Sequence, residues 1–167
     1  MTAYEKLLDE AYQLGLIVKE VHLKTRKGRC VGNRIAIDKA IKTDKEKACI
    51  LKEEIAHYLT TVGDITHQDI VSNKKQENIA RAFAIEDKCS LEHIISAIEK
   101  GALNQHEIID TLHLTDEFFD EAIQYHSRRQ GGYYDCGNGL ILYFDNGFGL
   151  YKTGTQSIDI QKINPVT

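Results

Sequence analysis

The sequence ACILKEEIAHY, at residues 48–58, decides which fold this chain is expected to have. Apolar residues recur in it at helical spacing, as Leu51 and Ile55 illustrate, so it is predicted to lie on an amphipathic helix. That helix is predicted to begin with Asp44 as its N-cap and to end before Gly63. One stripe of the helix therefore packs inward, and the charged residues are left on the other sides.

The charged side of this helix has the spacing of a metal site. Residues four apart stand on the same face of a helix, so Glu53 and His57 can approach one ion, as can Cys49 one turn earlier. Glu54 projects about 100° away, where it can act as a base beside a metal-bound water. In the related motif His-Glu-x-x-His, two histidines bind zinc and the glutamate accepts the proton of the water. A carboxylate at position 53 can also bind zinc, although it makes bound water less acidic than a histidine would.

Spacing alone would favour a solvated helix face for Glu53 and Glu54. The residues around them favour a metal site instead. Residues 48–58, followed by TTVGDI at residues 60–65, resemble the active helix of the ImmA/IrrE family of metallopeptidases. The form concerned is found in phages and mobile elements of low-GC Gram-positive bacteria. Its members often read Ala-Glu-Glu-Leu-Gly-His, so glutamate in place of the first histidine resembles a family variant.

The resemblance continues downstream and covers most of the chain. The sequence ENIARAFAIE at residues 77–86 is similar to the family's second helix, which supplies the third metal ligand. Glu77 is the matching ligand, with Glu86 as the alternative. The resemblance therefore implies a Zn²⁺ ion bound by Glu53, His57 and Glu77, with Glu54 as the catalytic base.

The fold implied is α+β, a zincin-like minimal metallopeptidase with an N-terminal helix, a small antiparallel sheet and the active helix. Helical periodicity predicts the first helix at residues 2–15 and a ligand-bearing helix at residues 75–87. Alternating apolar residues predict a strand at residues 17–23 and one or two further strands at residues 30–38. These elements make up a metallopeptidase-like domain at residues 1–89.

The remainder of the chain is predicted to form a helical subdomain and a hairpin. A helix-turn-helix-like subdomain at residues 90–130 begins with Ser90 as an N-cap and includes a later helix capped by Thr115. Glycine-rich sequence then predicts a C-terminal β-hairpin at residues 131–152, with its turn at residues 145–147. The helices of the subdomain are expected at residues 90–100, 104–112 and 115–128, and residues 153–167 are expected to be a weakly ordered tail.

Charge and hydropathy limit the classes of function. The formal charge of −4 argues against a general polyanion binder, although it leaves room for local basic patches. The acidic helix at residues 115–128 argues against direct nucleic-acid binding. No apolar run reaches the length of a membrane-spanning helix, and no secretory signal is visible, so we expect a cytoplasmic protein without a membrane partner. The four scattered cysteines are expected to be reduced thiols with structural roles.

The resemblance also implies a partner. The family cleaves or otherwise inactivates helix-turn-helix repressors of mobile elements, so we expect a zinc-dependent endopeptidase-like protein with an anti-repressor role. The main alternative is a catalytically inactive protein that antagonises the repressor by binding, and a DNA-binding regulator is a third class. Asp64 and His67, just past the active helix, are secondary candidates for the site, although a turn position and solvent exposure are their favoured interpretations.

Overall fold

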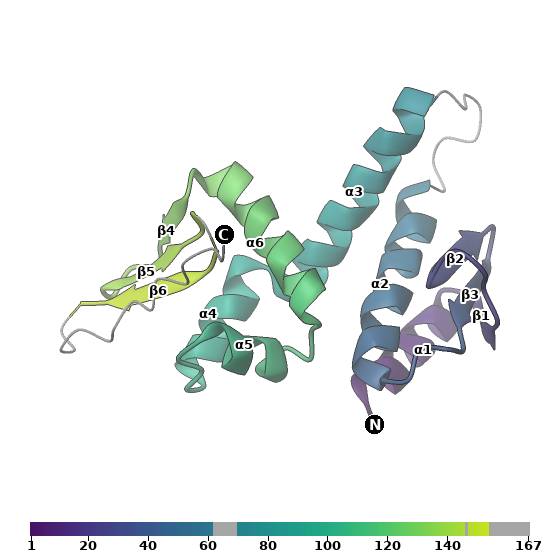
Figure 1. Ribbon diagram of the computed structural model, residues 1–167, viewed down its shortest axis with the longest axis horizontal. Coiled ribbons are helices and arrows are strands. Elements are labelled where there is room, and N and C mark those ends of the chain that lie inside the picture. The colour runs from purple at the N-terminus through teal and green to yellow at the C-terminus, as the bar shows by residue number, and fades with distance from the viewer. Residues whose placement is uncertain (62–69, 146, 154–167) are drawn as a thin grey trace, which may run out of the picture.

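The structure is a computed structural model that describes residues 1–61, 70–145 and 147–153. Its helices α2 and α3 run antiparallel in the middle of the molecule, with α1 and a small sheet on one side and α4–α6 with a second sheet on the other (Figure 1). The α+β class is therefore confirmed. Within the described ranges, no helix is long and apolar enough to cross a membrane. The elements are α1 (Ala3–Gln13), β1 (Ile17–Val21), β2 (Gly28–Val31), β3 (Arg34–Asp38), α2 (Asp44–Thr61), α3 (Ile70–Cys89), α4 (Leu91–Glu99), α5 (Gln105–Thr111), α6 (Asp116–Gln130), β4 (Tyr133–Asp135), β5 (Leu140–Tyr143) and β6 (Gly149–Lys152).

The first sheet is mixed, so the predicted antiparallel arrangement is wrong. Its strand order is β1-β3-β2, with β1 parallel to β3 and β2 antiparallel to β3. β2 and β3 form a tight hairpin through Gly32, whose φ of 56° suits a glycine turn. β3 takes the central position because it carries Ile35 and Ile37, which are almost fully buried, whereas β1 is largely exposed.

The first hydrophobic core lies between this sheet, α1 and α2. Ile35 and Ile37 of β3 belong to one buried cluster with Leu7 of α1 and with Leu51 and Ile55 of α2. α1 and α2 therefore cover the same face of the sheet. The helical stripe predicted for residues 44–62 packs inward at these positions, as expected.

The start of α2 differs by one residue from the prediction. The Thr43 hydroxyl accepts a hydrogen bond from the Glu46 N–H at 3.2 Å, so Thr43 caps the helix and Asp44 lies in its first turn. Both residues can cap helices, but only the hydroxyl of Thr43 stands three residues before a free helical N–H. The following helix, α3, is longer at both ends than the predicted range of residues 75–87.

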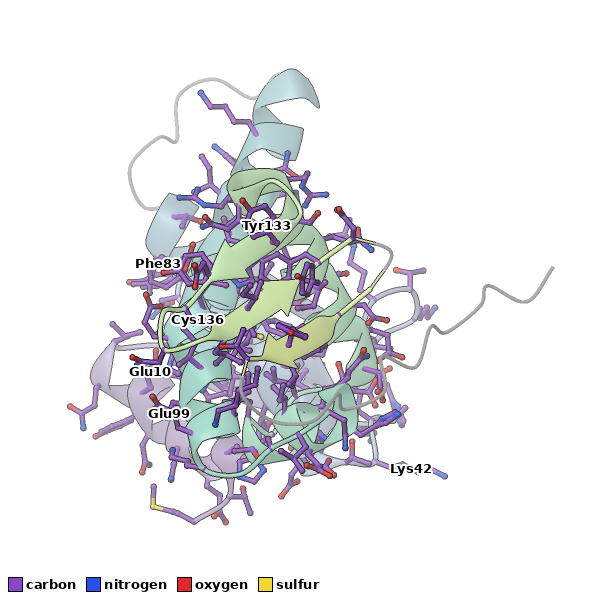
Figure 2. The ribbon with its side chains drawn as sticks, turned by 90° about the vertical axis from the view of Figure 1, so that its left-hand side faces the viewer. Glu10, Lys42, Phe83, Glu99, Tyr133 and Cys136 are labelled. Atoms are coloured by element: carbon purple, nitrogen blue, oxygen red, sulfur yellow. The ribbon has the colours of Figure 1, made fainter. Side chains whose placement is uncertain are left out.

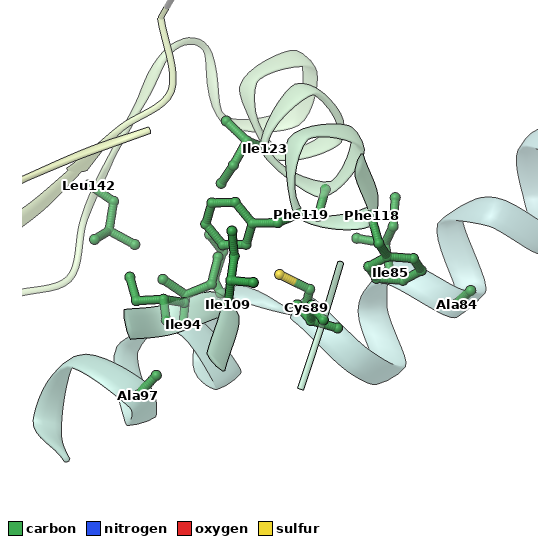
Figure 3. Close-up of a cluster of buried hydrophobic side chains, with 14 of the residues drawn as sticks. Ala84, Ile85, Cys89, Ile94, Ala97, Ile109, Phe118, Phe119, Ile123 and Leu142 are labelled. Carbon is green, nitrogen blue, oxygen red and sulfur yellow. The ribbon is translucent and has the colours of Figure 1, made fainter. Parts of the chain in front are cut away.

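The second hydrophobic core joins α3 to the C-terminal half of the chain. Phe119 of α6 lies among Ile94 of α4, Ile109 of α5 and Leu142 of β5, with Cys89 from the end of α3 beside them (Figure 3). The predicted N-caps Ser90 and Thr115 are both confirmed, because each side chain accepts a hydrogen bond from the N–H three residues on.

The C-terminal sheet has three strands rather than the two of the predicted hairpin. β4 pairs antiparallel with β5, and β5 pairs antiparallel with β6. The extra strand forms because Gly137 and Gly139 adopt positive φ values of 75° and 74°, which allow the chain to turn between β4 and β5. Figure 2 looks onto this sheet and labels Tyr133, at the start of β4, and Cys136, just after its end.

Two predictions concern residues outside the described ranges. Asp64 and His67 fall in the segment between α2 and α3, and the predicted tail falls outside the described residues from residue 154 onward. The division into units at residues 1–89, 90–130 and 131–152 stays a prediction.

A buried lysine ties α1, α2 and α3 together. Lys52 of α2 is only 1% exposed. Its Nζ lies 2.8 Å from Glu10 Oε1 of α1 and 2.8 Å from Asp87 Oδ2 of α3. The two carboxylates are about two-fifths exposed, so the lysine is the member of this trio that depends most on its partners.

We predict that the double variant Glu10→Gln/Asp87→Asn is destabilised by about 3–5 kcal/mol, because it leaves the buried ammonium without a counter-charge. Lys52→Met should be less destabilised, since it leaves only solvated carboxylates. Urea unfolding of the variants measures this difference. Asp110→Asn, which removes an exposed ion pair with Lys45, is the control and should change stability by less than about 1 kcal/mol. If Lys52→Met is less stable than the double variant, the two carboxylates do not serve to compensate the buried charge.

Candidate functional site

Charged side chains face one another along the contact between α2 and α3. Beyond the pair formed by Lys52 and Asp87, Glu53 contacts Arg81 and His57 contacts Glu77. The residue numbers rise along α2 as they fall along α3, as the antiparallel pairing of the helices requires. These contacts follow one another along the helix pair, toward the end at which residues 62–69 connect α2 to α3.

His57 and Glu77 meet at a distance that suits a shared ion. His57 Nε2 lies 3.5 Å from Glu77 Oε2. Two atoms bound to one tetrahedral zinc ion at about 2.1 Å lie about 3.4 Å apart. Two of the three predicted ligands are therefore brought together from different helices, as an ion pair whose separation is compatible with a common ion.

The third predicted ligand, Glu53, is turned toward an arginine. Its Oε1 accepts a hydrogen bond from Arg81 Nη1 at 2.5 Å. Burial raises the pKa of Glu53, and the neighbouring Glu121 and Glu77 raise it further, while Arg81 lowers it. The burial of this carboxylate thus outweighs the charge of its partner, and Arg81 is the cation that now compensates Glu53.

Glu54 lies between α2 and the edge strand β2. A Cβ on Gly28 would stand 2.6 Å from Glu54 Oε1 and 2.5 Å from Ile50 Cγ2, so the glycine makes the space that this carboxylate occupies. The backbone N–H of Cys30 lies close to the Glu54 carboxyl group and lowers its pKa. Since Asp38 N–H bonds to Lys27 O across β2 and β3, the N–H of Cys30 points to the edge of β2 that β3 does not cover.

The environment of Glu54 makes it a weak acid. Burial raises the pKa of Glu54 to about 7, and the charges of Glu53 and Glu77 add to that rise. The Cys30 N–H and the charge of Arg26 oppose it. A carboxyl group with a pKa near neutrality can both accept and donate a proton under physiological conditions.

The donor set fits a zinc ion in kind, and for two ligands in distance. Imidazole and carboxylate groups bind zinc. The charges of Glu121 and Glu77 act on Glu53, and those of Glu53 and Glu77 act on Glu54, while Arg81 and Arg26 provide the opposing positive charges. Glu53 fits as a ligand only after it exchanges its bond to Arg81. Consistent with that bond, the described residues hold no group of three or more His, Cys, Asp and Glu side chains already arranged around a common point.

The other candidates lie elsewhere. Glu86, the alternative third ligand, accepts a hydrogen bond from Tyr125 of α6 at 2.7 Å. Cys49 is buried among apolar residues and its pKa is raised by burial, which agrees with a packing role. All four cysteines are free thiols, as predicted.

Sequence reasoning missed Arg81, Gly28 and the Cys30 N–H. Arg81 follows Glu77 by four residues, so its position on the same helix face was available as a signal. Its pairing with Glu53 was not, because the two residues are 28 positions apart. The roles of Gly28 and Cys30 depend on how β2 packs against α2.

Comparison of the chain with models of protein families, with curated proteins and with solved structures gives no match.

Glu54 should make stability depend on pH. Because its pKa is higher in the folded protein than its ordinary value of 4.5, the folded state binds more protons than the unfolded state between pH 4.5 and 7. The free energy of unfolding should therefore fall as the pH rises through this window, by about 2 kcal/mol from this group. Glu54→Gln should show a flatter profile and be more stable than the wild type at pH 8, as measured by urea unfolding.

The control for that experiment is Glu99→Gln, which changes an exposed carboxylate at the end of α4 (Figure 2). Its pH profile should follow the wild type. Equal slopes for Glu54→Gln and the wild type between pH 4.5 and 7 would contradict the assignment of this pH dependence to Glu54.

Gly28→Ala should be destabilised by about 1–3 kcal/mol, because the new methyl group overlaps Glu54 and Ile50. The matched control is Gly149→Ala in β6, where the added Cβ would meet only Tyr143 Cβ, at an ordinary distance of 3.7 Å. Thermal unfolding of both variants tests the contact. The close packing of β2 on α2 would be disproved by a Gly28→Ala protein as stable as Gly149→Ala.

Proposed function

We propose that the protein is a zinc-dependent endopeptidase-like protein that acts on a helix-turn-helix repressor of a phage or mobile element. Glu53, His57 and Glu77 are its metal ligands, and Glu54 is its general base. The observation that carries this proposal is the contact between His57 Nε2 and Glu77 Oε2 at 3.5 Å, formed beside a carboxyl group whose pKa is about 7. The choice of repressor as substrate rests on the resemblance of residues 48–58 and 77–86 to the ImmA/IrrE family.

The chain's own residues would do the proton chemistry. A zinc ion at this site, when bound, would acidify a water and polarise a peptide carbonyl. Glu54 would accept the proton of the attacking water on a carboxylate oxygen and then deliver it to the leaving amine nitrogen. The Cys30 N–H, which acts on the Glu54 carboxyl group, would help to orient it for both transfers.

The position of β2 suits an extended peptide substrate. β2 is an edge strand, and the Cys30 N–H on its uncovered edge lies close to Glu54. An extended peptide could add to the backbone groups of this edge that Glu54 does not occupy, which would lay its peptide bonds beside Glu54. This arrangement supports an endopeptidase more than an enzyme for small molecules.

A second candidate function is a catalytically inactive protein that antagonises the repressor by binding alone. The hydrogen bond between Arg81 and Glu53 favours this second function, because an arginine bound to a predicted ligand can compensate the charge of the carboxylates without any metal ion. In that case the fold would be kept while turnover is lost.

Metal analysis and one variant separate the two functions. We expect the purified protein to contain one equivalent of zinc, and Glu54→Gln to keep the zinc but lose cleavage of a helix-turn-helix repressor in a gel assay. Glu99→Gln, remote from the site, should cleave as the wild type does. Absence of zinc, together with full anti-repressor activity in Glu54→Gln, would establish the binding protein and disprove the peptidase.

A further inference from the structure

Arg81 stands between two carboxylates from different helices. Its Nη1 lies 2.5 Å from Glu53 Oε1 of α2 and 2.9 Å from Glu121 Oε2 of α6. The side chain of Arg81, on α3, therefore connects the predicted metal ligand Glu53 to the C-terminal helical part of the chain. Guanidinium groups remain charged at any physiological pH, so this cation is permanent.

The two contacts of Arg81 differ in quality. The contact with Glu53 has the geometry of a hydrogen bond, whereas the contact with Glu121 is an ion pair without hydrogen-bond alignment. Glu121 Oε2 is in fact a buried oxygen that no hydrogen bond satisfies among the described residues. Such an atom has the capacity to accept a full hydrogen bond, and its neighbour Arg81 is placed to donate one.

Arg81 and a metal ion compete for Glu53. The Oε1 atom that Arg81 holds is one of the two oxygens with which Glu53 can bind an ion, and a fixed positive charge beside a dication is repulsive. Movement of Arg81 toward Glu121 would release that oxygen, remove the charge from the ion and satisfy the unbonded Glu121 Oε2. Each of these changes favours metal binding.

We propose that Arg81 sets the metal affinity of the site by exchanging its hydrogen bond from Glu53 to Glu121 when Glu53 becomes a ligand. This inference rests on the proposed zinc site but does not depend on catalysis. Arg81 is then a positioning residue that acts through Glu53, and Glu121 is the acceptor that receives it.

The exchange couples the metal site to α6. Glu121 lies on the helix that also carries Phe119, a central residue of the second core, so α6 is held firmly in place. If Arg81 binds Glu121 more tightly in the metal-bound protein, metal binding strengthens the contact between α3 and α6. By reciprocity, any partner that draws α6 away from α3 would weaken metal binding.

A double-mutant cycle tests the exchange. Zinc affinity would be measured by titration against a chromophoric chelator for the wild type, Arg81→Gln, Glu121→Gln and the double variant. We expect Arg81→Gln to bind zinc about tenfold more tightly and Glu121→Gln to bind it severalfold more weakly. In the Arg81→Gln background, Glu121→Gln should have a much smaller effect, because the acceptor matters only while Arg81 is present.

Two controls protect this test from a general loss of structure. Arg128→Gln, an exposed change at the end of α6, should leave the zinc affinity unchanged. Thermal unfolding of each metal-free protein would establish that it is folded.

Each outcome decides the inference. A wild type without measurable zinc binding and an Arg81→Gln protein that binds zinc would support it most strongly. Zinc binding that is equal in the wild type and Arg81→Gln, or a loss from Glu121→Gln of the same size in both backgrounds, would overturn it while leaving the proposed zinc site intact. If none of the four proteins binds zinc, the exchange and the proposed zinc site both fail.

Discussion

The close contact between α2 and α3 is the feature on which the rest of this structure depends. Ala56 of α2 and Ala80 and Ala84 of α3 are essentially fully buried in one cluster, and side chains this small let two helices approach closely. The same contact also joins the two cores, because α2 packs on the first sheet while α3 packs on α6. Larger residues at these positions would separate the helices, and with them His57 from Glu77.

The contact has an electrostatic consequence that apolar packing alone does not resolve. It places the carboxylates of Glu53, Glu54 and Glu77 near one another in a partly buried region, and burial with mutual repulsion raises the pKa values of Glu53 and Glu54. Two kinds of positive charge can relieve this repulsion: a bound cation, or a basic side chain. Arg81 provides the second for Glu53, which is one of the proposed metal ligands. The functional question for this chain is which of the two cations holds Glu53.

The sequence predicted those features whose signals are local. Helical periodicity and the caps Ser90 and Thr115 located the helices. The four-residue spacing of Glu53 and His57 predicted that both residues lie on one face of their helix, and both contact α3. The strand order β1-β3-β2 was not predictable in this way, because strand pairing joins residues far apart in the sequence. For the same reason Glu77 was placed by resemblance rather than by spacing, and Arg81 was missed although it stands one turn from Glu77. Features made by two elements together required the structure.

The most direct test of the account is a crystal structure of the protein grown with zinc, with anomalous scattering recorded at the zinc edge. We predict one ion bound by His57 Nε2 and by oxygens of Glu77 and Glu53, at about 2.0–2.2 Å, with Glu54 beside it. An ion bound elsewhere, or none between α2 and α3 while Arg81 still holds Glu53, would contradict the claim that these two helices form a metal centre.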